Sequence, residues 1–377
     1  MKALVLSTND YRSFPSRKQR FAGCLASLGM DVLYVEAPVT WLAALRPGHM
    51  RKLLAWREPP RLVAEHTWTI SPSPWLPLFK RYERIADYNA RRYRGFLDGL
   101  EGNWMEGVTV VLSYLPFIPD ALTGVPAPVI YDCVDDHAAY PGLLRKETVD
   151  RLEARTARMA SAVIATNQAI AVKLAEHASK LTVIANGVDY ELFAAPARTL
   201  HEGAALLERS HRFLYAGAMR EWFDVDAVAA VAVAFPSFVL DCYGLAMPAV
   251  RERLAPFRNV RLLGTVAQNH LAQVAPGYDL ALIPFTDCPL TSAVDPLKFY
   301  EYTAAGLPVV AGPIDALGAF DERQVMLAGS PREYVEAVQA MLDADTAALR
   351  RFRTEDARRF DWSLRLAEFR QVVTSVM

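Results

Sequence analysis

The sequence predicts an α/β protein made of two Rossmann-like lobes, each built on a parallel sheet, that face each other across a cleft. The chain has 377 residues, which is more than one core of ordinary size holds, so two domains are expected. Short apolar runs alternate with amphipathic helical patterns along almost the whole chain, and this alternation is typical of parallel sheets with helical crossovers. The pattern weakens around residues 194–210, where we place the domain boundary.

The first lobe begins with a strand, a helix and a second strand. Residues 3–7 form an apolar run, and a helix follows in which Ser16 is the expected N-cap and Gly29 the expected stop. The next apolar run covers residues 31–38. A strand–helix–strand unit has a right-handed crossover and predicts a parallel sheet. Further strands are expected at 108–116, 126–134, 162–167 and 180–189, and helices at 147–162 and 168–178.

The second lobe repeats this alternation and is followed by helices to the end of the chain. Strands are expected at 212–218, 238–244, 259–265, 279–285 and 308–312, and helices at 224–235 and 295–306. We therefore expect a first domain at 1–200 and a second at 201–361. The last segment, 362–377, is expected to pack back on the first domain, with Trp362 at its start.

The composition predicts a soluble cytoplasmic protein. Hydrophobic residues make up 52% and charged residues 22% of the chain, and no run of about 18 apolar residues exists that could span a membrane. The apolar run at the N-terminus is too short for a signal peptide. The cysteines Cys24, Cys133, Cys242 and Cys288 lie far apart without a CxxC pair, which is typical of reduced thiols.

A basic, aromatic-rich segment extends from Trp41 to about residue 97. Residues 41–96 contain eleven Lys or Arg but only four acidic residues, together with several tryptophans. One interpretation is an anionic membrane surface contacted by residues 41–97, which would place the protein peripherally at the inner face of the plasma membrane. The other is a solvated helical face whose aromatic residues belong to the core. No nucleic-acid-binding motif accompanies the charge, so nucleic acid is not an expected partner.

The segment DPLKFYEYTAAGLPVV (residues 295–310) predicts a short helix with an anion site at its start. Asp295 is the expected N-cap, and Gly306 is the expected left-handed stop. Lys298 falls in the first turn, where backbone amides and the helix dipole already favour an anion. Glu301 lies one turn further on the same face and could accept both hydroxyls of a ribose. The pair suits a nucleotide diphosphate; an intrahelical ion pair on a solvated face is the alternative.

Several segments resemble family 4-like glycosyltransferases of the GT-B fold. They are PLKFYEYTAAGLPVV, ANGVDYELF (185–193), RFLYAGAMREWFDVDAV (212–228), DLALIPF and DWSLRLAEF, and their order and spacing cover nearly the whole chain. The segments SRKQRFAGCLASLGMDVLYVEAP and YDCVDDH resemble a subgroup that acts in bacterial cell-surface polysaccharide assembly.

The resemblance implies transfer of a sugar from a UDP- or GDP-linked donor to a hydroxyl of a glycan or lipid-linked acceptor, without a metal or other cofactor. Lys298 matches the residue for the diphosphate and Glu301 the residue for the ribose. Gly217 matches the turn where the backbone approaches the phosphates. Many retaining members carry a further glutamate where this chain has Ala293. A substitute contact to the donor sugar could come from Thr291 or Ser292.

The first lobe offers the candidate base and acceptor contacts. Asp135, Asp136 and His137 follow an expected strand and therefore lie at the carboxyl edge of the sheet, where open α/β sheets bind ligands. The resemblance favours Asp135, which aligns best with the family's base, and Asp136 is second. If both carboxylates are desolvated, their repulsion raises the pKa of one of them and so favours a base. Arg17 and Gln19 begin the first helix, where a cation is unfavourable without an anionic partner, so both are candidate contacts to an acceptor phosphate.

Other chemistries find less support in the sequence. Asp224 and Asp226 spell a DxD metal motif, but they open a helix, where acidic residues favour the N-terminus, so no metal is expected. No GxGxxG follows the first strand, which argues against a nicotinamide enzyme. Two alternatives remain: a nucleotide-sugar epimerase of GT-B shape, and a non-catalytic GT-B scaffold subunit supported only by Ala293.

Overall fold

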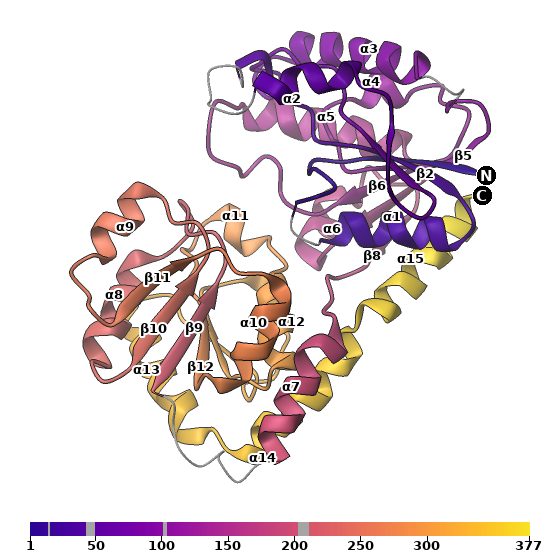
Figure 1. Cartoon of the computed structure of the whole chain (residues 1–377). Coiled ribbons are helices and arrows are strands. Elements are labelled where there is room, and N and C mark those ends of the chain that lie inside the picture. Colours follow the sequence, from indigo (N-terminus) through magenta and orange to yellow (C-terminus); the bar gives the residue numbers. More distant parts are fainter. Residues whose placement is uncertain (14–15, 43–49, 101–103, 203–210) are drawn as a thin grey trace. The chain divides into compact units, whose positions relative to one another are not determined.

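The computed structural model describes residues 1–377 except 14–15, 43–49, 101–103 and 203–210 (Figure 1). The chain divides into two compact units. The first unit comprises Met1–Ala185 together with Leu366–Met377, and the second comprises Asn186–Arg365. Two units built on parallel sheets confirm the predicted fold class.

The first unit is built on an eight-stranded sheet with the order β3-β4-β2-β1-β5-β6-β7-β8. All neighbouring strands are parallel except β3, which pairs antiparallel with β4. The hairpin of β3 and β4 was not predicted, because its strands are only four residues long and lie within the basic segment. The strands are β1 (Lys2–Leu6), β2 (Asp31–Val35), β3 (Arg61–Ala64), β4 (Thr67–Ile70), β5 (Val108–Ser113), β6 (Val129–Cys133), β7 (Ala162–Ala165) and β8 (Leu181–Val183).

Helices cover both faces of this sheet, with α3, α4 and α5 on one side and α1 on the other (Figure 1). Helix α1 begins after Ser16, which forms a capping box with Gln19, and ends before Gly29 at φ 80°, as predicted. The helices are α1 (Arg17–Ser27), α2 (Met50–Leu54), α3 (Glu83–Asp98), α4 (Pro119–Leu122), α5 (Lys146–Met159) and α6 (Gln168–Leu174).

The second unit is built on a fully parallel six-stranded sheet with the order β11-β10-β9-β12-β13-β14. Helices α8 and α13 pack together on one face, and α7, α10, α12 and α14 cover the other (Figure 1). The strands are β9 (Arg212–Ala216), β10 (Val239–Tyr243), β11 (Val260–Gly264), β12 (Leu280–Ile283), β13 (Val309–Ala311) and β14 (Val325–Leu327). The helices are α7 (Tyr190–Glu202), α8 (Val225–Ala234), α9 (Pro248–Leu254), α10 (Gln268–Val274), α11 (Pro289–Ser292), α12 (Leu297–Ala304), α13 (Pro331–Ala344) and α14 (Ala347–Asp356).

Helix α7 belongs to the second unit, whereas the sequence analysis assigned residues up to 200 to the first domain. Phe193 and Ala194 are fully buried in the same core as Phe213 of β9, which explains this membership. The last helix, α15 (Trp362–Val376), is divided between the units after Arg365. Its later part packs on the first unit, where Phe369 stacks on Phe21 with ring centres 4.0 Å apart.

The DxD sequence has a structural role in the second unit. The Asp224 side chain caps α8 by accepting a hydrogen bond from the N–H of Ala227 at 2.9 Å, as expected from its place at a helix start. Asp226 pairs with Arg253.

Within the described part of the chain, no helix combines the length and the apolar character that a membrane crossing requires.

Candidate active site

Helix α12 carries the two residues that suit a nucleotide diphosphate. The helix begins after Pro296, and its first turn contains Lys298 and no acidic residue. The first-turn N–H groups and the helix dipole give this end a partial positive charge. Gly306 has φ 82° and ends the helix in the left-handed conformation, as predicted.

The N-cap position of α12 is held by Pro296 and not by Asp295, contrary to the expectation. The Asp295 carboxylate accepts hydrogen bonds from the Tyr300 hydroxyl and from the N–H of Asn186, each at 2.6 Å. The Asn186 side chain donates in return to the Asp295 carbonyl at 2.9 Å. Asp295 therefore connects the segment before α7 to α12.

Lys298 lies against Gly217, the residue that follows β9. A Cβ on Gly217 would come within 2.1 Å of Lys298 Cε, so any larger residue here would displace the end of this lysine side chain. The Nζ atom lies 5.9 Å from the ring centre of Tyr215 and 5.7 Å from that of Phe285. Burial lowers the pKa of the Lys298 ammonium, and the charge of Glu301 offsets part of that effect. Lys298 makes no hydrogen bond or ion pair with any residue that the structure describes.

Two backbone hydrogen bonds hold Gly217 and α12 together. The N–H of Ala216 donates to the buried hydroxyl of Tyr302 on α12 at 2.7 Å. The N–H of Gly217 donates to the carbonyl of Tyr243 at the end of β10, also at 2.7 Å. The contact between Lys298 and Gly217 is therefore set by the strand ends and not by a flexible loop.

Glu301 is positioned by a residue that the sequence analysis missed. Gln268, the first residue of α10, donates its side-chain amide to Glu301 Oε1 at 2.9 Å. Both side chains are half-buried, and the hydrogen bond restricts the orientation of the carboxylate. No local pattern marks Gln268, because it lies 33 residues before its partner.

Thr291 and Ser292 form part of the short helix α11. The Thr291 side chain is buried, and its hydroxyl lies 2.5 Å from the carbonyl oxygen of Thr286 and 2.9 Å from that of Cys288. The Ser292 hydroxyl donates to the Cys288 carbonyl at 3.0 Å and is half-buried. Both hydroxyls thus shape the loop that precedes α12, and a contact of either with a donor sugar stays a prediction.

Arg17 and Gln19 serve the structure of the first unit. The Arg17 side chain is 3% exposed; its Nε donates to Asp132 at 2.7 Å and its Nη1 to the Ile184 carbonyl at 2.7 Å. The Gln19 side chain accepts from Ser16 in the capping box and donates to the Tyr11 carbonyl at 3.2 Å. The carboxylate of Asp132 supplies the anionic partner that Arg17 was expected to find in an acceptor.

Asp135 and Asp136 follow β6 at the carboxyl edge of the sheet, as expected, but they do not share one environment. Asp135 accepts a hydrogen bond from the Tyr140 hydroxyl at 2.9 Å. Asp136 pairs with Lys173 at 2.6 Å and accepts from the N–H of Ala138 at 3.1 Å. The two carboxylates therefore have different partners, and the role of either as a base stays a prediction.

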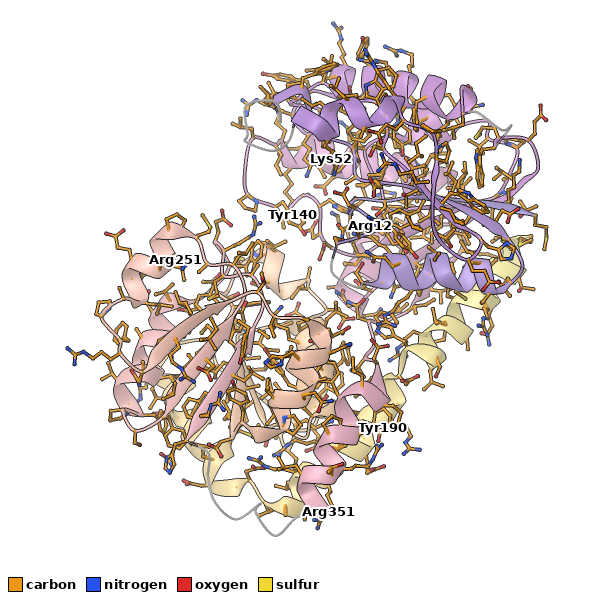
Figure 2. All side chains as sticks on the ribbon, viewed as in Figure 1. Arg12, Lys52, Tyr140, Tyr190, Arg251 and Arg351 are labelled. Carbon is orange, nitrogen blue, oxygen red and sulfur yellow. The ribbon has the colours of Figure 1, made fainter. Side chains whose placement is uncertain are left out.

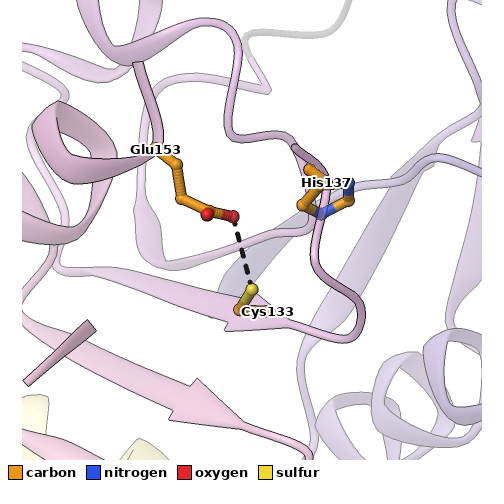
Figure 3. A group of neighbouring side chains, drawn as sticks. All are labelled: Cys133, His137 and Glu153. Atoms are coloured by element: carbon orange, nitrogen blue, oxygen red, sulfur yellow. Dashed lines mark hydrogen bonds between the residues drawn. The ribbon is translucent and has the colours of Figure 1, made fainter. Parts of the chain in front are cut away.

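His137 is buried, and it is neutral at ordinary pH. Burial and the nearby ammonium groups of Lys80, Lys18 and Lys173 lower the pKa of His137 to about 3. Figure 3 shows His137 beside Cys133 and Glu153, whose Sγ and Oε1 atoms are 3.4 Å apart. These three side chains offer ligand atoms within 4.8 Å of one another.

Lys173 supplies the positive charge next to this group. Its Nζ atom lies 2.6 Å from Asp136, 3.0 Å from Asp150 and 2.8 Å from Glu153. Burial would lower the pKa of Lys173, but the three carboxylates hold it well above the usual range. The ammonium thus occupies the position between three carboxylates where a cation would otherwise be bound.

The fold has close counterparts among solved glycosyltransferase structures. A sucrose-phosphate synthase from Thermosynechococcus elongatus is 16% identical, with a TM-score of 0.74 over 99% of this chain and 98% of its own. HepE from Anabaena, in complex with UDP, is 15% identical, with a TM-score of 0.63 over 100% of both chains. A UDP-forming trehalose-phosphate synthase from Burkholderia vietnamiensis is 13% identical, with a TM-score of 0.68 over 100% of this chain and 98% of its own. The chain has the GT-B fold. At these identities the likeness concerns the fold alone.

A comparison of sequences finds one relative with a named activity. The putative teichuronic acid biosynthesis glycosyltransferase TuaH of Bacillus subtilis (strain 168) is 25% identical over an alignment of 270 residues, which covers 65% of this chain and 66% of TuaH. The match thus spans slightly less than two thirds of TuaH. No family model matches the chain.

Proposed function

We propose that the chain is a glycosyltransferase that moves a sugar from a nucleotide diphosphate donor to a hydroxyl of a glycan acceptor during cell-surface polysaccharide assembly. The proposal is carried by the position of Lys298, a half-buried cation in the first turn of α12 that forms no ion pair or hydrogen bond with any described residue. A nucleotide diphosphate would supply an anionic partner. UDP is the favoured nucleotide, since HepE was solved with UDP and the trehalose-phosphate synthase is UDP-forming.

The chemistry at α12 follows from its charges. As the bond to the sugar breaks, negative charge grows on the leaving diphosphate. Lys298 and the first-turn amides of α12 would stabilise this charge without rearrangement, because Gly217 and Tyr302 already hold them in place. Glu301, oriented by Gln268, would accept the hydroxyls of the ribose. Ser292 and Thr291 remain candidates for the donor sugar, and no metal is required by this scheme.

The acceptor would be deprotonated in the first unit. Asp135 is the preferred base, because the resemblance favours it and because it follows β6 at the carboxyl edge of the sheet, where it accepts a hydrogen bond from Tyr140. Asp136, which is paired with Lys173, is the second candidate. Arg17 and Gln19 become less favoured acceptor contacts, since the protein itself satisfies most of their polar atoms.

We also propose membership of the family 4-like group and a peripheral location at an anionic membrane. The segment 41–97 supports the location, because several of its large apolar side chains are exposed, among them Trp41, Leu54 and Tyr82. Against it, Trp75 is buried in the core. Sedimentation with anionic vesicles should decrease as salt rises. Equal sedimentation with neutral vesicles would contradict the membrane role.

The decisive test of the function is donor binding and turnover. Isothermal titration calorimetry should detect UDP, and a panel of UDP- and GDP-sugars should reveal the donor by its stabilisation of the fold. Glu301→Gln should lose UDP affinity, while Glu336→Gln, an exposed change on α13, should not. UDP released without a new glycoside would indicate hydrolysis, and a changed donor sugar would indicate an epimerase. No nucleotide binding at all would leave only the scaffold interpretation.

A further inference from the structure

Lys80, in the loop before α3, is a second cation without an anionic partner. Its Nζ atom lies 4.8 Å from the ring centre of Phe117 and 5.7 Å from that of Tyr140. It makes no ion pair or side-chain hydrogen bond with any described residue. Burial lowers the pKa of Lys80, and no nearby carboxylate counteracts this effect. An ammonium in such surroundings is stabilised when an anion takes the place of the missing carboxylate.

His137 is a second unsatisfied donor that borders the same two rings. Its ring centre lies 5.7 Å from that of Phe117 and 6.4 Å from that of Tyr140. The His137 side chain is 6% exposed, and its Nε2 atom has no hydrogen-bond partner among the described residues. The neutral imidazole carries one N–H, and in the tautomer with the proton on Nε2 this atom can donate to an incoming oxygen. Lys80 and His137 thus both lack an acceptor, and an oxyanion offers several.

Lys18 adds a further positive charge near this place. It is 7% exposed, and its Nζ atom donates to the Thr8 hydroxyl at 2.5 Å. Burial lowers the pKa of Lys18, and the carboxylates of Asp135 and Asp132 offset part of that effect. Lys18 and Lys80 both lower the pKa of His137. Tyr140 joins Asp135 to the aromatic wall through the 2.9 Å hydrogen bond.

We infer that Lys80, the Nε2 atom of His137 and the aromatic wall of Phe117 and Tyr140 bind an anionic group, a phosphate or a carboxylate, on the acceptor. Tyr140, labelled in Figure 2, is half-buried, as is Lys80, so both remain open to solvent at this edge. The inference rests on the proposed function, because it places the anionic group close to Asp135 and hence close to the hydroxyl that reacts. It narrows the acceptor to an anionic one, either an acidic sugar or a phosphate-linked carrier.

Binding to the full chain tests the inference with three probes. Geranyl diphosphate represents a phosphate-linked carrier, methyl β-glucuronide an acidic sugar, and methyl β-glucoside the neutral control. We expect one of the anionic probes to bind and the neutral probe not to. Lys80→Ala should weaken that binding about 10- to 100-fold, the scale of one charge-assisted hydrogen bond. Lys80→Arg should retain most of it because the charge remains.

Lys180→Ala is the matched control, since Lys180 is an exposed lysine of the same unit at the start of β8. Equal affinities of Lys80→Ala and Lys180→Ala for the anionic probe would overturn the inference, provided circular dichroism shows both variants folded. Equal binding of the neutral probe would overturn it as well. Because His137 also borders Cys133 and Glu153, every titration is repeated with EDTA. Anion binding that disappears with EDTA would assign the site to a metal instead.

UDP binding measured on the same samples separates this inference from the proposed function. Lys80→Ala should bind UDP like the unaltered protein, whereas Glu301→Gln should lose UDP affinity and keep the anionic probe. Failure of the unaltered chain to bind UDP would refute the proposed function and leave an anion site without it. UDP binding without selective binding of either anionic probe would refute only the inference.

Discussion

The first turns of α1 and α12 look alike in sequence but differ in the structure. Each helix carries in its first turn a basic residue that the helix dipole disfavours, Arg17 in α1 and Lys298 in α12, and both were predicted to meet an anion. In α1 the anion is internal, since Arg17 pairs with the fully buried Asp132 at 2.7 Å. In α12 no described residue pairs with Lys298, and aromatic rings surround its ammonium instead.

The difference shows that a cation at a helix start does not by itself indicate a ligand. What matters is whether a distant part of the chain supplies the counter-charge. Asp132 lies 115 residues after Arg17 in the sequence. The two side chains meet only because the fold places β6, which carries Asp132, beside the start of α1. Lys80, like Lys298, forms no ion pair with a described residue. The two lysines therefore mark one candidate ligand site in each unit.

The largest effect should come from breaking the internal pair. Arg17→Met keeps much of the side-chain volume but leaves the buried Asp132 without a partner, so unfolding of the first unit should become easier by about 3–5 kcal/mol. Urea unfolding followed by tryptophan fluorescence measures this, since five of the seven tryptophans lie in the first unit. Arg12→Ala, an exposed change in the same unit, should have little effect. If Arg17→Met were as stable as the unaltered protein, Asp132 would not be the counter-charge that stabilises Arg17 in the fold.

A change at the unpaired cation should act on turnover and not on stability. Lys298→Ala removes a charge that burial already disfavours, so the fold should be no less stable. It should lower kcat about 10²-fold, the scale of one lost donor to a developing negative charge. Steady-state kinetics with the identified donor measure the loss, and Lys180→Ala is the control. A turnover equal to that of the control would remove Lys298 from the mechanism.

The fold and α12 could be predicted because they depend on local patterns. Buried strands read as short apolar runs, and Gly306 marks a helix end whatever surrounds it. The hairpin of β3 and β4 was not predicted because each of its strands has only four residues. The role of Asp295 was wrong, since its partner Asn186 lies 109 residues away.

The candidate site could be predicted in part. Lys298, Glu301 and Gly217 were found from a motif, and the structure brings Lys298 and Gly217 into contact. Lys80 could not be found, because it is distinguished only by forming no ion pair with a described residue. Gln268 could not be found, because its partner Glu301 lies 33 residues away in the sequence. A sequence shows which charges exist, but only a fold shows which of them are left unpaired.

Substitution of Gln268 should have the smallest effect on catalysis, and it tests whether Glu301 of α12 binds the ribose. Gln268→Ala removes one hydrogen bond to Glu301, so the donor KM should rise about 2- to 10-fold with kcat nearly unchanged. Gln268→Glu should raise KM further, because it places a second carboxylate beside the first. The control is Gln339→Ala, an exposed glutamine that makes a similar 2.9 Å hydrogen bond to Asp343 within α13. A fall in kcat instead of a rise in KM would mean that Glu301 acts on the breaking bond and not on the ribose.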